Sequence, residues 1–462
     1  MLCENNFNVI NVYKTKPSKN RKYYLLKKIG IGAGAVASGR IIGMLATFLF
    51  NAILARMISQ DEMGYYFLIL SLVTFFAIFA RSGCENLVLK LVADALSSRS
   101  ANEIRQLIKK FSILFGFSSF VTVIVCWFLL QWLFNSVFSA PQLAELVPLM
   151  CIWLVMIAAQ LVLGQTLRAF KHFLACSFLS GPLSSVMNLV GMLLINGLGQ
   201  ESSFFDVLIL IVCNLTVVIA LAIYYVFKSL EDCSYETEVS SNEKVSNLLL
   251  LSVPLFITQL AMFSSSQSDI WLMSAFLPPD QIGLYGASAK LVFLLSLSLA
   301  IANGVLPPYI ADFRNKGDIV GLQKILRFVA TLASMPALIG IFVLFFFSES
   351  IMGFVYGESY SIASDVVKIL CLGQLVNVMV GSCGYVLIMF GFNQLLMKLT
   401  IFFGLLAFVG GYILLINGFG LIEMAILNVF VLSCQQLCLL YFAKQKCGVF
   451  TATKIFLTRS DL

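Results

Sequence analysis

The sequence predicts an all-α integral membrane protein with about twelve transmembrane helices, arranged as two parallel six-helix repeats around a central cavity. Three observations support this fold class. The chain of 462 residues is 60% hydrophobic and 11% charged, with a mean hydropathy of +0.95, whereas a soluble domain carries about 25% charged residues. Apolar segments follow one another along the whole chain, and one stretch of sequence recurs in its second half.

The apolar segments are each long enough to span a membrane as a helix, which takes about 20 residues. The twelve predicted segments cover residues 33–55, 63–84, 111–134, 145–165, 175–196, 204–227, 247–277, 281–306, 325–348, 362–390, 395–416 and 420–443. The first of them is the expected insertion signal, because the preceding residues contain no long apolar core. The 12 cysteines include no C-x-x-C pair, so no metal site and no disulfide framework are expected.

Lys and Arg predict the orientation of these segments. With the N-terminus in the cytoplasm, 24 of the 30 basic residues fall in cytoplasmic tails and loops and one, Arg56, falls outside. The other five lie in or at the edge of apolar segments: Arg40, Arg81, Lys90, Lys290 and Lys368. The positive-inside rule therefore predicts that both termini are cytoplasmic. This distribution also explains the net charge of +7 without a nucleic-acid partner.

The longest polar stretch inside the chain, at 228–246, predicts its division into domains. It is acidic and rich in Ser, which is typical of a linker. We expect a basic cytoplasmic tail at 1–29, a six-helix bundle at 30–227, the cytoplasmic linker at 228–246, a second bundle at 247–443 and a cytoplasmic tail at 444–462.

The internal repeat supports this division. Residues 55–76 and 274–295, 219 positions apart, share five identities: Asp61 with Asp280, Gly64 with Gly283, Tyr66 with Tyr285, Leu72 with Leu291 and Val73 with Val292. A second pair, QLIKKF at 106–111 and QKILRF at 323–328, has nearly the same spacing. Six segments per half return the chain to the same side of the membrane, so the repeats are expected to be parallel.

Charged residues inside apolar segments are the candidate functional residues, because a charge at mid-bilayer costs about 3 kcal/mol on insertion scales. The candidate substrate-binding cations of the cavity are Arg40, Arg81, Lys290 and Lys368. The candidate ion-coupling or charge-partner carboxylates are Asp269, Asp365 and Glu85. The slight excess of cations suits a phosphate-bearing substrate, with Arg capable of bidentate contact.

Each candidate also has a structural alternative. Arg81 can snorkel to the membrane surface. Asp269 and Lys290 lie at similar depth on neighbouring segments, where they can neutralise each other. Asp365 and Lys368 are three residues apart and can form a pair on one helix. The segment that contains Arg40 reads G-R-I-I-G, which also favours close helix packing.

Several motifs resemble the polysaccharide transporter family. An Asp in the seventh segment precedes Gly-x-Tyr-x-x-Ala-x-Lys-Leu at the start of the eighth, with Ser in place of the usual Ala. Here these residues are Asp269, Gly283, Tyr285, Ser288, Lys290 and Leu291, followed by Pro307 before a charged loop. In the first half, the similar residues are Ala55, Arg56, Gly64 and Tyr65. The resemblance extends from about residue 30 to 445.

This resemblance implies a MATE-like fold and a flippase rather than an enzyme. Family members translocate undecaprenyl-pyrophosphate-linked oligosaccharides, such as O-antigen, capsule or exopolysaccharide repeat units, across the bacterial inner membrane by alternating access. The implied partners besides the substrate and membrane lipids are a polysaccharide polymerase and a chain-length regulator. No phosphate-binding loop for ATP occurs, so coupling to a gradient of H⁺ or Na⁺ is expected, without a cofactor.

Three other functions are compatible with parts of this pattern. A cation-coupled multidrug or small-solute antiporter of the same superfamily is the main alternative. A major-facilitator transporter also has six plus six segments, but the characteristic Gly/Asp/Arg-rich loop between segments two and three is absent. A membrane glycosyl polymerase would need a larger outer loop than the longest one here, at about 349–361.

Overall fold

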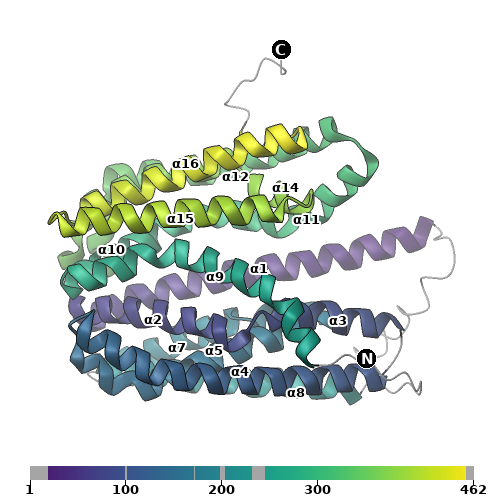
Figure 1. Cartoon of the computed structure of the whole chain (residues 1–462). Helices are drawn as coiled ribbons and strands as arrows, with labels where there is room; N and C mark the ends of the chain where they lie inside the picture. The colour runs from purple at the N-terminus through teal and green to yellow at the C-terminus, as the bar shows by residue number, and fades with distance from the viewer. Residues whose placement is uncertain (1–18, 99–100, 171, 198–202, 232–244, 454–462) are drawn as a thin grey trace, which may run out of the picture.

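The computed structural model describes residues 19–98, 101–170, 172–197, 203–231 and 245–453, and every regular element in these ranges is a helix. In chain order they are α1 (Lys19–Met57), α2 (Gln60–Arg81), α3 (Cys84–Ser98), α4 (Ala101–Ser136), η2 (Pro141–Leu146), α5 (Val147–Ala169), α6 (Phe173–Leu179), α7 (Pro182–Gly197), α8 (Phe204–Glu231), α9 (Val245–Phe276), α10 (Pro279–Phe293), η3 (Leu294–Ser296), α11 (Leu297–Lys316), α12 (Ile319–Tyr356), η4 (Glu358–Ala363), α13 (Ser364–Val380), α14 (Cys383–Met389), α15 (Asn393–Ile416) and α16 (Leu421–Cys447). Most helices run along one common direction (Figure 1).

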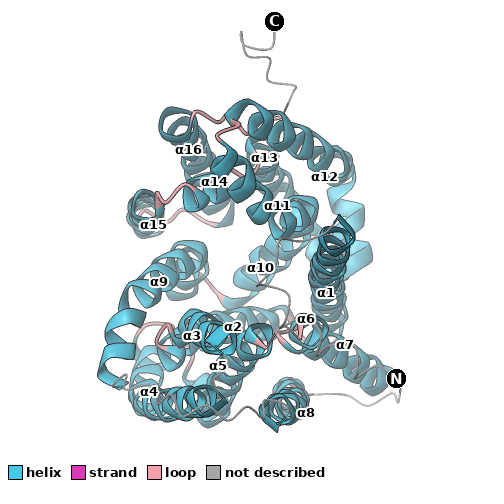
Figure 2. Ribbon diagram, turned by 90° about the vertical axis from the view of Figure 1, so that its right-hand side faces the viewer, coloured by secondary structure: helices cyan, strands magenta, loops and turns pink. Residues whose placement is uncertain are grey.

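The helices form two bundles, which we call the first half (α1–α8) and the second half (α9–α16). Seen along the helix direction, α2–α8 and α10–α16 lie on opposite sides of a junction, and α1 and α9 occupy its two edges (Figure 2). Each predicted segment coincides with one helix or with consecutive helices. Within the described residues, ten stretches are long and apolar enough to cross a membrane. The predicted fold class, a multi-pass helical membrane protein, is confirmed.

Helix breaks are the main departure from the sequence prediction. Segments 175–196, 281–306 and 362–390 were expected as single helices, but they are interrupted between α6 and α7, at η3, and between α13 and α14. At the last of these breaks Gly381 has a φ of +76°, a left-handed conformation that ends a helix and favours glycine. The stretch 84–98, which lies between the predicted segments 63–84 and 111–134, is helix α3. Ser82 and Gly83, at φ of +46° and +71°, separate it from α2.

The internal repeat is visible in the positions of the helices. The starts of α2 and α10 lie 219 positions apart, those of α4 and α12 lie 218 apart, and those of α5 and α13 lie 217 apart. Helices α1 and α9 end 219 positions apart, at the same end of the molecule (Figure 1). The short 3₁₀ helices η2 and η4 also occupy equivalent places, before α5 and α13. The two halves are therefore copies of one topology.

The tightest contact between the halves joins α2 to α10 at their N-terminal ends. A Cβ on Gly64 would overlap the carbonyl oxygen of Pro279, and a Cβ on Gly283 would lie 2.5 Å from the carbonyl oxygen of Gln60. The two glycines are the repeat-related pair found in the sequence, so equivalent positions of the halves meet each other here. Two helix backbones approach this closely only where side chains are absent.

Further contacts seal the same end of the molecule, which we call the closed end. Arg56 donates hydrogen bonds to the carbonyl oxygens of Phe354 and Val355. Gln60 Nε2 donates to the carbonyl oxygen of Ser359 at 2.9 Å. The corner between α1 and α2 is thereby fixed to the C-terminal end of α12 and to η4.

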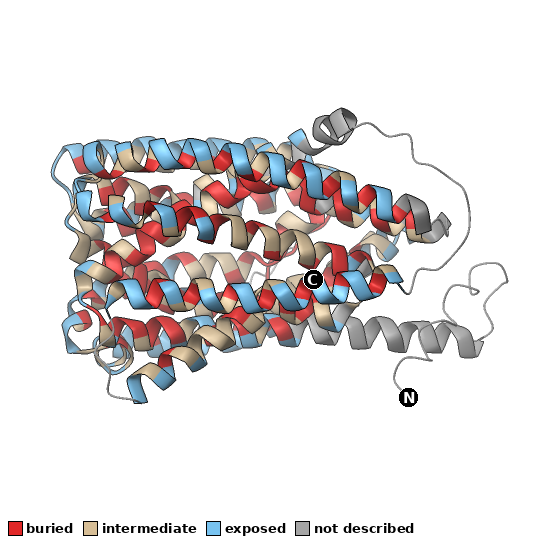
Figure 3. Ribbon diagram, turned by 90° about the horizontal axis from the view of Figure 1, so that it is seen from below, coloured by how far each residue is buried: buried red, intermediate tan, exposed pale blue. Residues whose placement is uncertain are grey.

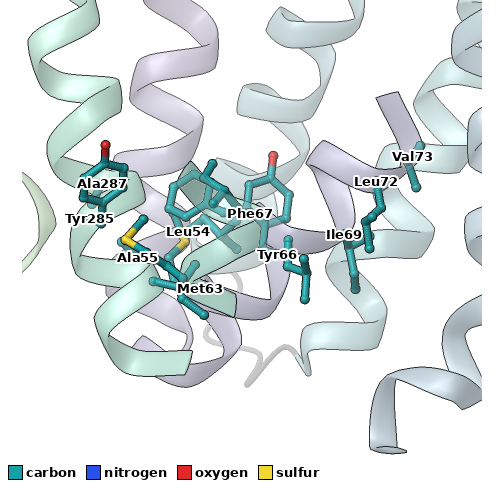
Figure 4. Packing of buried hydrophobic residues seen from close by; sticks show 14 of the residues in the cluster. Leu54, Ala55, Met63, Tyr66, Phe67, Ile69, Leu72, Val73, Tyr285 and Ala287 are labelled. Atoms are coloured by element: carbon teal, nitrogen blue, oxygen red, sulfur yellow. The ribbon is translucent and has the colours of Figure 1, made fainter. Parts of the chain in front are cut away.

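Apolar side chains from both halves pack behind these polar contacts. Figure 4 shows Leu54, Met63 and Phe67 of the first half close to Tyr285 and Ala287 of α10. All of these residues are at most 2% exposed and belong to one buried cluster. The core therefore continues through the junction between α2 and α10.

The outward faces of the helices carry large exposed apolar side chains. They include Phe117, Phe128, Ile339, Phe346 and Phe402, each more than half exposed. Figure 3 shows exposed positions along the outer helix faces and buried positions toward the interior. Such an apolar periphery is unfavourable in water and is expected where lipid surrounds a helix bundle.

The segment after α16 packs into the second half. Thr453 donates its backbone N–H to the carbonyl oxygen of Met379 at 3.0 Å, and Thr451 Oγ1 donates to the carbonyl oxygen of Val380 at 2.8 Å. Both threonines are fully buried. These bonds satisfy carbonyl groups at the end of α13, which the break at Gly381 leaves without helical partners.

Substitution of Gly64 tests the close approach of the halves. The methyl group of Gly64→Ala has no room against α10, and such overpacking typically costs about 1–3 kcal/mol. We expect a lower midpoint of thermal unfolding in detergent. The matched control is Gly116→Ala, because a Cβ on Gly116 meets no atom within 4 Å. Equal midpoints for the two variants would contradict the proposed role of the contact.

Candidate functional site

Two of the predicted cations, one from each half, lie in a single pocket. Arg40 of α1 and Lys290 of α10 line a pocket of about 340 Å³ between α1, α7 and α10. Neither forms an ion pair or a side-chain hydrogen bond with any residue that the structure describes. Lys290 Nζ lies 6.0 Å from the centre of the Phe67 ring, a weakly favourable cation–π distance. The pocket thus receives one basic side chain from each half, and neither is held in an ion pair with a described residue.

Close packing of α1 on α6 and α7 positions Arg40. A Cβ on Gly39 would overlap Ser177 Oγ, and a Cβ on Gly43 would lie 3.1 Å from the Cα of Pro182. The G-R-I-I-G stretch therefore makes the close helix contact considered from the sequence, while Arg40 lies in the adjacent pocket. On the other side of the junction, Arg40 Nη1 lies 3.4 Å from the position of a Cβ on Gly304 of α11. A glycine in the second half leaves space for the guanidinium group.

Asp269 of α9 lies in a hydrogen-bonded cluster of the second half. It accepts bonds from Tyr285 Oη at 2.7 Å and from Asn428 Nδ2 at 2.9 Å. Its carboxylate forms no ion pair with Lys290 among the described residues, so direct mutual neutralisation is not observed. Three helices, α9, α10 and α16, thereby meet at one carboxylate.

The first half lacks a counterpart of this cluster at the equivalent, described positions. Phe50 lies 219 positions before Asp269 and packs its ring 6.3 Å from that of Tyr66. Tyr66 is the repeat partner of Tyr285. The same helix pair therefore has an aromatic contact in the first half and a carboxylate–phenol hydrogen bond in the second. Only the second arrangement can bind or exchange a cation or proton through these positions.

Arg81 and Glu85 form a buried ion pair rather than contributing an unpaired charge to the pocket. Arg81 contacts the Glu85 carboxylate directly, and both residues are 8% exposed. The other carboxylate oxygen of Glu85 accepts a hydrogen bond from Gln259 of α9. This pair bridges the break between α2 and α3 and ties the first half to α9.

Lys368 and Asp365 form the self-contained pair considered from the sequence. Lys368 Nζ lies 2.8 Å from Asp365 Oδ1, three residues earlier on α13, and both side chains are substantially exposed. The structure places this pair outside the pocket formed by Arg40 and Lys290. Of the four predicted cations, Arg40 and Lys290 are the two brought together.

A second, larger pocket lies between α2, α4, α9 and α15. It has a volume of about 810 Å³ and contains no charged residue among its described lining residues. Aromatic rings dominate one wall, where Phe75 and Trp271 meet edge to face at 4.9 Å. Trp271 Nε1 donates to Ser71 Oγ at 3.0 Å. This pocket is suited to apolar groups, and the sequence analysis did not identify it because its walls come from four separate helices.

Sequence reasoning also missed three residues near the predicted charges: Asn428, Gln259 and Gly304. Asn428 is a polar residue within an apolar helix, which is a detectable signal. Gln259 is detectable through the repeat, because it lies 219 positions after Arg40. Within the described residues, no group of three or more His, Cys, Asp or Glu side chains is placed to hold a metal ion.

Removing one partner of the buried Arg81–Glu85 pair is expected to lower the free energy of unfolding strongly. Glu85→Gln leaves the buried guanidinium of Arg81 without its counter-charge, which typically costs about 3–5 kcal/mol. We expect a clearly lower midpoint of thermal unfolding. The control is Asp312→Asn, which breaks the exposed pair with Lys316 at the same four-residue spacing and is expected to cost less than about 1 kcal/mol. Similar losses in both variants would show that burial does not set the strength of the pair.

Solved structures of one transporter superfamily share this fold. An inward-facing multidrug resistance MATE family transporter of the MOP superfamily has a TM-score of 0.68 and 14% identity, over 88% of this chain and 94% of that chain. The lipid II flippase MurJ in an inward closed conformation has a TM-score of 0.65 and 15% identity, over 90% and 87%. An outward-facing MATE family transporter has a TM-score of 0.60 and 14% identity, over 91% and 96%. At these identities the likeness establishes the fold.

A family assignment comes from the sequence itself. No curated protein sequence matches the chain, but the model of one protein family matches residues 29–314, which is more than half of its length. The match includes most of α1, with Arg40, and all of α10, with Asp280 through Lys290. The chain belongs to the polysaccharide biosynthesis protein family and has the MATE-like fold.

Proposed function

We propose that the protein is a flippase for an undecaprenyl-pyrophosphate-linked oligosaccharide, such as an O-antigen, capsule or exopolysaccharide repeat unit. It would move this lipid from the cytoplasmic to the outer leaflet of the bacterial inner membrane by alternating access. Family membership supports polysaccharide biosynthesis as the setting. A polymerase and a chain-length regulator are the partners that would use the product.

The observation that carries this proposal is the pocket formed by Arg40 and Lys290. Both basic residues lie in apolar helix segments, and neither forms an ion pair with a described residue. Such charges are costly in hydrocarbon and are retained where an anion or water reaches them. A pyrophosphate group supplies several anionic oxygens, for which Arg is a bidentate partner and Lys a compact charge.

The position of the closed end supports access to the pocket from the cytoplasm. Most basic residues of the described helices lie toward the opposite end, which the positive-inside rule assigns to the cytoplasm. The contact between Gly64 and Gly283 would then block the outer side. Rocking of the halves about the junction would open the other side.

The Asp269 cluster is the proposed coupling site. Its carboxylate is bound by Tyr285 and Asn428, which are both neutral, so it can exchange a proton or accept Na⁺ without first breaking an ion pair. Tyr285 and Lys290 both lie on α10. Protonation of Asp269, or binding of Na⁺ to it, would alter its bond with Tyr285 and could thereby shift α10 and the position of Lys290. This arrangement supports coupling of translocation to an ion gradient.

The alternative is a cation-coupled multidrug or small-solute antiporter, and the apolar pocket of about 810 Å³ is the observation that favours it. Such a pocket is large enough for an apolar drug-sized molecule. The two functions predict different consequences of deletion. A flippase deletion removes surface polysaccharide and leaves lipid-linked repeat units facing the cytoplasm, whereas an antiporter deletion changes dye efflux and leaves the glycan intact.

Neutralisation of the pocket tests the flippase proposal. In a deletion strain, Arg40→Gln and Lys290→Gln are each expected to restore surface polysaccharide at least about tenfold less efficiently than the unmodified protein, because each loses a charge-assisted contact. Polysaccharide is measured per amount of membrane-inserted protein. The control is Lys316→Gln, at an exposed pair on α11. Full export by the double variant Arg40→Gln/Lys290→Gln would exclude the proposed mechanism.

A second substitution tests coupling. Asp269→Asn keeps the size of the side chain but removes its titratable charge, so transport is expected to lose its dependence on an imposed H⁺ or Na⁺ gradient. Tyr285→Phe keeps the carboxylate and should retain that dependence at a reduced rate. Flipping of a fluorescent lipid-linked saccharide in proteoliposomes provides the measurement. An Asp269→Asn variant that still responds fully to the gradient would place coupling elsewhere.

A further inference from the structure

The internal repeat relates the two pockets to each other. Helices α2, α4, α9 and α15, which line the apolar pocket, correspond to α10, α12, α1 and α6–α7 in the other half. Three of those counterparts, α1, α7 and α10, line the cationic pocket. The two pockets therefore lie between corresponding helices on opposite edges of the junction, where α9 and α1 lie (Figure 2). One opening is apolar and the other carries two positive charges.

The repeat also relates one contact at each edge. At the apolar edge, Gln259 of α9 donates a hydrogen bond to Glu85 of α3. The positions 219 residues away from these two are Arg40 and Gly304. Those two residues are also neighbours, because Arg40 Nη1 lies 3.4 Å from the position of a Cβ on Gly304. The contact between α9 and α3 thus has a counterpart between α1 and α11, but the residues that meet there differ in charge.

The two contacts differ in whether a carboxylate is present. At the apolar edge Glu85 accepts a hydrogen bond from Gln259 and pairs with the buried Arg81, so the charge of Arg81 is compensated. At the cationic edge the position 219 residues later, Gly304, has no side chain, and Arg40 forms no ion pair with a described residue. A carboxylate at residue 304 would lie within reach of that guanidinium group.

We infer that Gly304 is a specificity-determining residue of the cationic pocket. By withholding the carboxylate that its repeat partner Glu85 supplies, it keeps Arg40 available to an anionic lipid headgroup. This inference rests on the proposed function, because it assumes that the pocket formed by Arg40 and Lys290 receives an anion. It adds a reason why the pocket beside α1, and not the pocket beside α9, receives an anion.

The test compares charged and neutral side chains of the same size at residue 304. The full-length protein in lipid nanodiscs is titrated with geranylgeranyl pyrophosphate, and the dissociation constant is measured for Gly304→Glu, Gly304→Gln and Arg40→Gln. We expect Gly304→Glu to bind at least about tenfold more weakly and Gly304→Gln to stay within about threefold of the unmodified protein. Adding Arg40→Gln to Gly304→Glu should cause little further loss, since the introduced carboxylate would already pair with Arg40.

The outcomes separate the inference from the proposed function. If Arg40→Gln binds the probe as tightly as the unmodified protein, the anion pocket itself is wrong. If Arg40→Gln weakens binding while Gly304→Glu and Gly304→Gln behave alike, only the role of Gly304 is wrong. The shorter matched pair Gly304→Asp and Gly304→Asn repeats the comparison where a longer side chain prevents folding.

Discussion

The close approach of α2 and α10 at Gly64 and Gly283 determines how the two halves meet. Because no side chain separates the two helix backbones there, the halves are held in one register at the closed end. That register brings α1 against α10 and α11 on one edge, and α9 against α2 and α3 on the other. The cationic pocket and the apolar pocket both follow from this arrangement, since each is walled by helices of both halves.

The two halves share one helix topology but differ in the polar side chains at equivalent positions. The two halves repeat their helices at nearly constant spacing, yet their polar groups do not repeat. Asp269 replaces the aromatic Phe50, and Gly304 replaces the acidic Glu85. These differences place Arg40 and Lys290 in a pocket at one edge and the hydrogen-bonded Asp269 carboxylate in the second half alone. The repeat accounts for the shared helix arrangement, and divergence at a few positions accounts for the different polar groups.

Hydropathy and repeat spacing were sufficient to predict the fold, because each helix is a local apolar segment. The ion pair of Asp365 with Lys368 was also accessible, since both residues lie on one helix. The helix breaks were harder to predict from the sequence. Ser82, the first residue between α2 and α3, adopts a left-handed conformation that is unusual for serine. The pairing of Arg81 with Glu85 could not be predicted for the same reason, because the two residues lie on either side of that break and Glu85 also contacts the distant α9.

The packing of Thr451 and Thr453 against the end of α13 has a consequence for how the protein is made. During translation, α13 is synthesised about 70 residues before the segment that satisfies its last carbonyl groups. Until that segment emerges, the open end of α13 has unmet hydrogen-bonding capacity inside the membrane protein. These bonds can therefore form only after residue 453 has been synthesised, and a fusion partner joined directly after α16 would remove them.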